Sequence, residues 1–235
     1  MAGVRAILLA ALIPFCGQAA AECRLALALG MDVSGSVDDV EYRQQLDGLA
    51  NALMSDAVRG ALLAIPGRPV RITAYEWSGP GAMRILLPWT EIDGAVTLAQ
   101  AAGQIRQIER REFPPETALG RALEIGGGFL AEQPCDRRTL DISGDGPSNA
   151  GPHPRSVTLR GVTVNGLVIG GGAGDLAGYY RAYVTQGPNS FVEIAENFAD
   201  YEAAMRFKLL REIGGLAVAA VATTEDTPSR SQGDQ

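Results

Sequence analysis

The sequence predicts an α/β fold: a doubly wound, mostly parallel six-stranded sheet with one short antiparallel edge strand and helices on both faces. Apolar segments of strand length alternate with segments of helical periodicity along most of the 235 residues, and this alternation is typical of parallel sheets. The first expected strand, residues 24–31 (RLALALGM), is apolar almost throughout, as strands buried on both faces are. Two polar loops, MDVSGS and SGDGPSN, directly follow strands, which places both at the ligand-binding edge of such a sheet.

The individual elements follow from local periodicity and turn residues. Apolar residues recur at helical spacing between Val40 and Met54, and acidic residues precede them as expected at a helix start. The turn at residues 78–81 (SGPG) predicts that the next short strand returns antiparallel. The expected strands are residues 24–31, 70–77, 83–87, 139–143, 162–169 and 190–194. The expected helices are residues 38–57, 97–110, 117–132, 175–184 and 199–213.

The N-terminal residues 1–21 have the three parts of a secretory signal peptide. Arg5 precedes an apolar stretch over residues 6–15, and three alanines at 19–21 form the expected cleavage site before Glu22. The apolar stretch is shorter than the roughly 20 residues that span a bilayer. We therefore expect residues 22–215 to form one periplasmic or secreted domain without a membrane span, followed by a disordered tail at 216–235.

The net charge bears on the kind of partner, and the cysteine content bears on a possible disulfide. The formal net charge of −7 and the pI of about 4.8 argue against nucleic acid as a partner, because such a surface needs a basic face. Cleavage of the signal peptide would remove Cys16 and leave Cys23 and Cys135. Two cysteines in an oxidising compartment suggest one disulfide, provided that the fold brings them together.

The loop after the first strand contains Asp32-x-Ser34-x-Ser36, which three chemistries would explain. A nucleophilic serine needs a base, but the single histidine, His153, lies in G-P-H-P, and Asp32 stands where the G-x-S-x-G motif requires glycine. A phosphate loop needs a glycine-rich motif after the first strand, and none stands there; the glycines at 170–172 and 174 follow a late strand with no lysine nearby. A metal site built from oxygen atoms remains as the best explanation.

The predicted metal ligands are Asp32, Ser34, Ser36, Thr117 and Asp145. Asp145 follows the strand at 139–143 and so lies at the same edge of the sheet as the D-x-S-x-S loop, and Thr117, which is expected to open a helix, offers a further hydroxyl. Oxygen donors suit Mg²⁺, or alternatively Mn²⁺ or Ca²⁺. Each residue also has a purely structural interpretation, as a helix cap, an acceptor for backbone amides or part of a turn.

In type and chain order these five residues resemble the metal-ion-dependent adhesion site of von Willebrand factor A domains. The resemblance covers nearly all of the chain after the signal peptide. The segments Y-E-W-S-G at 75–79, W-T-E-I-D at 89–93 and I-S-G-D-G-P-S-N at 142–149 resemble one bacterial exported subfamily, domain of unknown function 1194. The chain departs from that subfamily at 149–162, where G-P-H-P-R-S-V-T-L-R-G replaces an expected helix.

The resemblance implies a non-enzymatic, metal-dependent adhesion module that recognises an acidic residue of a protein partner. The serines and the threonine would contact the cation, and the aspartates would act directly or through water. A periplasmic metal-dependent hydrolase, or a structural domain with a vestigial site, are the alternatives. In this fold the strands that follow Cys23 and Cys135 are parallel neighbours, which predicts a Cys23–Cys135 disulfide. Asp141, inside an expected strand, has no role that the sequence assigns.

Overall fold

The computed structural model describes residues 23–170 and 175–214; the expected signal peptide (1–21) and tail (216–235) lie outside the described residues. The strands are β1 (Leu25–Asp32), β2 (Val70–Trp77), β3 (Met83–Ile92), β4 (Arg137–Gly144), β5 (Thr163–Ile169) and β6 (Val192–Ala195). The helices are α1 (Asp39–Met54), α2 (Asp56–Leu63), α3 (Ala95–Arg106), α4 (Leu119–Ala131), α5 (Leu176–Tyr183) and α6 (Tyr201–Gly214). Short 3₁₀ turns occupy Pro154–Ser156 and Phe198–Asp200.

The six strands form one sheet in the order β3-β2-β1-β4-β5-β6, which confirms the predicted fold class. All neighbouring strands pair in parallel except β2 and β3. After β1 the chain first builds towards β3 and later returns to place β4 on the other side of β1. The strand order therefore reverses between β1 and β4, where doubly wound sheets bind their ligands.

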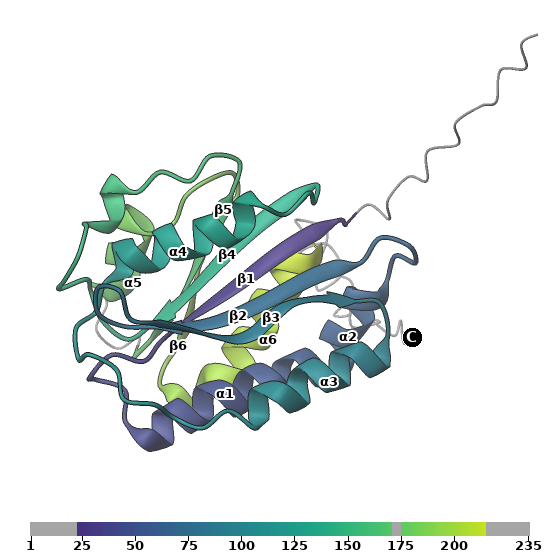
Figure 1. Cartoon of the computed structure of the whole chain (residues 1–235), viewed down its shortest axis with the longest axis horizontal. Coiled ribbons are helices and arrows are strands. Elements are labelled where there is room, and N and C mark those ends of the chain that lie inside the picture. The colour runs from purple at the N-terminus through teal and green to yellow at the C-terminus, as the bar shows by residue number, and fades with distance from the viewer. Residues whose placement is uncertain (1–22, 171–174, 215–235) are drawn as a thin grey trace, which may run out of the picture.

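Helices cover both faces of the sheet (Figure 1). Helices α1, α2, α3 and α6 lie on one face, and α4 and α5 lie on the other. Each face has its own apolar core: Leu27, Leu46 and Leu49 belong to the first, whereas Leu123, Leu140 and Ile142 belong to the second. β1 contributes to both cores and is buried along its whole length, as its apolar sequence predicts. No helix in the described part of the chain is long and apolar enough to cross a membrane.

Several elements differ from the sequence-based boundaries, and three of these differences change the local structure. The antiparallel edge strand is longer than predicted, because it continues through Pro88 to Ile92; proline is tolerated on an edge strand, which has one unpaired side. The helix expected at 38–57 ends at Met54, where Ser55 adopts an extended conformation and a second helix, α2, begins. Helix α4 begins at Leu119, so Thr117 precedes the helix and does not open it.

The predicted disulfide between Cys23 and Cys135 is confirmed, with the two Cα atoms 4.6 Å apart. The register of the central strands explains it, because Leu25 of β1 lies opposite Arg137 of β4. Both cysteines stand just before these strands, and the backbone N–H of Asp136 donates to the carbonyl of Cys23 at 3.1 Å. The bond therefore joins the ends of the two central strands opposite the predicted metal site.

Asp141, which had no assigned role, belongs to a buried ionic network. Its carboxylate lies 2.8 Å from the Lys208 ammonium of α6, which also contacts the Glu212 carboxylate. Asn165 of β5 donates a hydrogen bond to Glu212 at 2.8 Å. Burial opposes the charge of Lys208, but the carboxylates of Asp141 and Glu212 outweigh it and raise the pKa of the lysine. The network fastens α6 to the centre of the sheet.

We predict that replacing both Cys23 and Cys135 by alanine lowers the free energy of unfolding by about 2–5 kcal/mol. The bond links positions 112 residues apart, and a cross-link over so long a loop restricts the unfolded chain strongly. Urea denaturation of the oxidised, reduced and doubly substituted proteins measures the effect. A difference below about 1 kcal/mol would contradict the prediction.

Lys208→Met is expected to cost about 3–5 kcal/mol, because it leaves two buried carboxylates without their cation. Arg59→Met is the matched control. It removes a cation from the exposed pair with Asp56, and such pairs contribute roughly 0–1 kcal/mol. Equal losses in the two variants, measured by urea denaturation, would show that the buried network does not stabilise the fold.

Candidate metal centre

The D-x-S-x-S loop begins where β1 ends. Asp32 is the last residue of β1, and its carboxylate accepts a hydrogen bond from the backbone N–H of Ser34 at 2.8 Å. The Val37 N–H donates to the Ser34 carbonyl at 3.0 Å and closes a turn. The Oγ atoms of Ser34 and Ser36 then lie 3.3 Å apart. Alternate positions in this loop thus direct their oxygen atoms to the same place.

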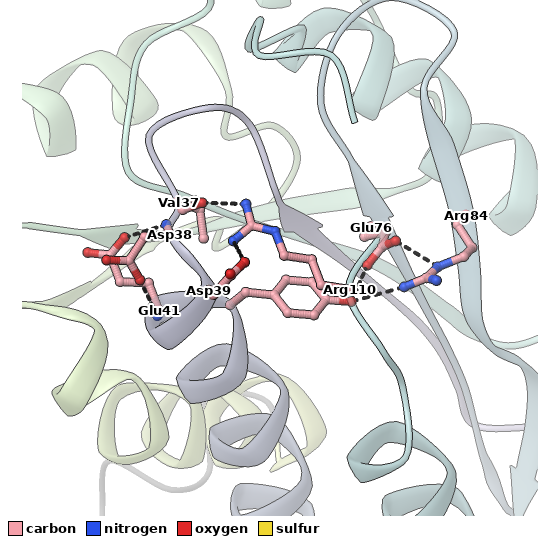
Figure 2. Close-up of polar contacts among 8 residues, drawn as sticks. Val37, Asp38, Asp39, Glu41, Glu76, Arg84 and Arg110 are labelled. Carbon is pink, nitrogen blue, oxygen red and sulfur yellow. Dashed lines mark hydrogen bonds and ion pairs between the residues drawn. The ribbon is translucent and has the colours of Figure 1, made fainter. Parts of the chain in front are cut away.

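Helix α1 does not use Ser36 as its cap. Asp38 is the N-cap, and its side chain accepts from the Glu41 N–H while the Glu41 carboxylate accepts from the Asp38 N–H. This reciprocal arrangement is a capping box, and Figure 2 shows it beside the loop. The hydroxyl of Ser36 is therefore directed to the site, where it donates to Asp145 Oδ1 at 2.8 Å.

Thr117 reaches the site from the long connection between α3 and α4. Its hydroxyl lies 3.2 Å from the Oγ of Ser34, and it does not cap α4, whose N-cap is Ala118. Gly35 allows this approach: its N–H donates to the Pro115 carbonyl at 3.0 Å, and a Cβ at Gly35 would lie 2.8 Å from the Cβ of Pro115. The glycine between the two serines thus lets the Thr117 connection pack against the loop.

Asp145 enters from the loop after β4, directly beside β1. The register pairs Met31 with Ser143, so the two strands end together. The structure brings all the predicted ligands to this edge, with a chain of hydroxyl contacts from Thr117 through Ser34 and Ser36 to Asp145. None of the predicted ligands lies elsewhere.

Asp32 is the most strongly perturbed residue of the site. Its side chain is fully buried, and Oδ2 has no hydrogen-bond partner among the described residues. Burial raises the pKa of Asp32 to about 7, and the nearby charge of Asp145 contributes to the rise, whereas hydrogen bonds from Ser34 oppose it. A buried carboxylate oxygen without a donor is costly unless something positive contacts it.

Residues outside the predicted set hold the connection to Thr117 in place. Arg110 donates to the Val37 carbonyl and pairs with Asp39 at 2.9 Å, which ties the connection to the start of α1 (Figure 2). Arg84 of β3 donates to the Glu109 carbonyl at 3.0 Å and pairs with buried Glu76 at 2.7 Å. These arginines belong to structural contacts, and no local motif identifies them in the sequence.

The loop that follows β4 also holds the backbone of Thr117 in place. Asn149 Oδ1 accepts from the Thr117 N–H at 2.8 Å, and the Asn149 N–H donates to the Thr117 carbonyl at 2.9 Å. Ser148 also donates its hydroxyl to that carbonyl, at 3.2 Å. The polar run G-P-S-N after Asp145 signals these contacts in the sequence, but only the fold shows their partner.

The donor set fits a hard cation. It contains hydroxyl and carboxylate oxygens, which Mg²⁺, Mn²⁺ and Ca²⁺ prefer. Within residues 23–170 and 175–214, no group of three or more His, Cys, Asp or Glu side chains is placed to hold a metal ion. A cation here would depend on the hydroxyls of Ser34, Ser36 and Thr117 as well as on the two carboxylates. Asp32 Oδ2 is buried without a hydrogen-bond donor, so a bound cation would stabilise its negative charge.

Solved structures with a similar fold come from a mussel and from bacteria. Proximal thread matrix protein 1 from the mussel byssus, with a zinc-occupied MIDAS motif, matches with a TM-score of 0.58 and 17% identity over 82% of this chain and 48% of that one. A von Willebrand factor type A protein from Catenulispora acidiphila matches with a TM-score of 0.57 and 17% identity over 82% of this chain and 43% of that one. The PilB minor pilin of Streptococcus sanguinis, as a D319A mutant, matches with a TM-score of 0.59 and 11% identity over 88% of this chain and 65% of that one.

The chain therefore spans about half the length of the mussel and Catenulispora proteins that it matches. No curated protein sequence matches it. The family model described as "Protein of unknown function (DUF1194)" matches residues 22–217, most of the chain. The protein belongs to this family of unknown function, DUF1194, and its fold is that of the von Willebrand factor A domain.

Proposed function

We propose that this protein is an exported adhesion-type module that binds a protein partner through a divalent cation, with Mg²⁺ as the leading candidate. The observation that carries the proposal is the convergence of Asp32, Ser34, Ser36, Thr117 and Asp145 at one edge of the sheet, where Asp32 Oδ2 is buried without a donor among the described residues. The bound cation would act as a Lewis acid that accepts an oxygen ligand from the partner.

The composition of the site favours an acidic partner residue. Ser34, Ser36 and Thr117 would bind the cation through neutral hydroxyl oxygens. The only formal negative charges among the five proposed ligands are therefore those of Asp32 and Asp145. Neutral donors leave the charge of a cation less compensated than carboxylates would, and a carboxylate from another protein completes the shell favourably. Binding of the metal and binding of the partner are then linked.

A recess beside the site gives the partner room. Asp145 lines a cavity of about 500 Å³ together with Tyr179, Leu176 and Phe198. The cavity is also lined by Ile169 and Gly170 at the carboxyl end of β5, so it lies at the same sheet edge as the proposed ligands and could receive a side chain next to the partner's acidic residue. Similar folds in a mussel byssus matrix protein and in a pilus adhesin from Lactobacillus rhamnosus GG agree with an adhesive role.

The hydrolase alternative has less support, because it requires a base above the metal. The single histidine, His153, packs against the ring of Tyr183, with centroids 5.1 Å apart, and its Nδ1 accepts from the Arg155 N–H at 3.2 Å. These contacts give His153 a structural role in the segment at 149–162. The remaining alternative, a structural domain with a vestigial site, is tested directly by metal binding.

Calorimetric titration with Mg²⁺ and with Mn²⁺ is expected to show one binding site in the wild-type protein. Asp32→Ala should abolish the heat, and Thr117→Val should weaken binding at least about tenfold, since each removes an oxygen ligand. Thr73→Val is the matched control: Thr73 is also buried, but its hydroxyl donates to the Leu87 carbonyl at 2.8 Å, away from the site. Absence of heat from the wild type would refute the adhesion site and favour the vestigial alternative.

Affinity purification from extracts of the exporting cell should recover a partner in Mg²⁺ and release it with a chelator. The Asp32→Ala bait should recover none of it, and the Thr73→Val bait should recover as much as the wild type. Substitution of the partner's acidic residues one at a time by the corresponding amides should then identify a single essential carboxylate. A partner that stays bound in chelator would contradict metal-bridged recognition.

A further inference from the structure

A buried tyrosine, Tyr180, lies next to the candidate metal centre at the carboxyl end of β4. Tyr180 of α5 is fully buried, and its ring packs against the strands β4 and β5 at two glycines. A Cβ added to Gly166 would lie 2.7 Å from the Cδ1 of Tyr180, and one added to Gly144 would lie 2.5 Å from its hydroxyl oxygen. The absence of side chains at both glycines lets the hydroxyl reach the carboxyl end of β4.

This hydroxyl comes close to Asp32. The same Cβ position on Gly144 lies 3.0 Å from Asp32 Oδ2, so the tyrosine hydroxyl and the carboxylate oxygen are both within 3.0 Å of one point. Neither atom has a hydrogen-bond partner in the described part of the chain, and both are buried. Two unpaired polar atoms facing the same point in a protein interior are uncommon, and each is costly by itself.

Tyr180 differs in this respect from other buried tyrosines of the core. The Tyr75 hydroxyl donates to the Ala122 carbonyl at 2.9 Å, and the Tyr201 hydroxyl lies 3.3 Å from the Oγ of Ser143. A phenylalanine would fill the space occupied by the Tyr180 ring without burying a polar atom. The hydroxyl therefore needs an explanation other than packing.

A hydrogen bond between the Tyr180 phenol and the Asp32 carboxylate can have only one direction, with the phenol as the donor. An ionised carboxylate only accepts, whereas a phenol can donate. We propose that Tyr180 is a positioning residue of the metal centre, whose hydroxyl donates to Asp32 Oδ2, directly or through one water, when the site is loaded. Since this oxygen has two lone pairs, one then remains for the cation or for a water bound to it.

The inference rests on the proposed metal-binding function and adds a residue to it. Residues that hydrogen-bond to metal ligands fix the orientation of those ligands, and their loss commonly weakens metal binding about 10- to 100-fold. Tyr180 would hold Asp32 from the α5 side of the sheet, while the Ser34 N–H holds the other carboxylate oxygen. In the loaded site Asp32 would then be held at both of its carboxylate oxygens.

The test is Tyr180→Phe in the full chain, measured by titration with Mg²⁺ and Mn²⁺ and by thermal unfolding in chelator. We expect metal affinity to fall about 10- to 100-fold, with the unfolding temperature in chelator unchanged or higher because an unpaired hydroxyl is removed. Tyr75→Phe is the control. It removes a satisfied hydrogen bond to the Ala122 carbonyl that involves none of the proposed ligands, so the unfolding temperature should fall and the metal affinity should stay at the wild-type value.

A second measurement needs no substitution that could disturb folding. In protein labelled with ¹³C at the Cζ of tyrosine, saturation with Mg²⁺ should move the Tyr180 resonance and leave the Tyr75 resonance in place. A wild-type affinity in Tyr180→Phe, or an unmoved Tyr180 resonance, would overturn the inference while leaving the metal site intact. A wild-type protein that binds neither cation would instead refute the proposed function, and this inference with it.

Discussion

The parallel pairing of β1 with β4 is the constraint on which the rest of the structure depends. Their register, from Leu25 opposite Arg137 to Met31 opposite Ser143, makes the two central strands begin together and end together. At one end it brings the cysteines close enough for a disulfide. At the other it places Asp145 beside Asp32, although more than a hundred residues separate them in the chain. A shift of one residue would reverse the faces of every β4 side chain and separate both pairs.

The segments that form the candidate metal centre are held by contacts that do not involve the hydroxyls of Ser34, Ser36 and Thr117. The cap of α1 is Asp38, the Thr117 backbone is held by Asn149, and the Gly35 N–H binds Pro115. These contacts offset the conformational entropy that is lost when the connections become ordered, and they do so without using the side-chain oxygens of the proposed ligands. Such preorganisation favours metal binding, because the ligands lose little further freedom when a cation arrives.

Buried charge occurs in two places of different character. The network of Asp141, Lys208 and Glu212 contains its own cation and joins α6 to the sheet. Asp32, by contrast, is buried next to hydroxyls and another carboxylate, and its Oδ2 has no hydrogen-bond partner among the described residues. An acid that the protein does not neutralise internally is typical of functional sites rather than of structural ones. The contrast between Asp141, which has its own cation, and Asp32, which has none beside it, supports a binding role for Asp32.

The sequence by itself determined the fold class and which residues cluster at the candidate site, because strand periodicity is a local signal and the residue types in their chain order resemble a known family. The number of cysteines suggested one disulfide, but the pairing of Cys23 with Cys135 could be predicted only once the fold placed their strands side by side. Tertiary structure alone decided how Thr117 reaches the site from a connection rather than from a helix, and what Asp141 does. Arg110 and Tyr180 likewise have no local signature: their partners Val37 and Gly144 are distant in sequence. Contacts of this kind depend on which elements the sheet places side by side, and the physical reason is that packing, unlike periodicity, is not encoded in any short segment.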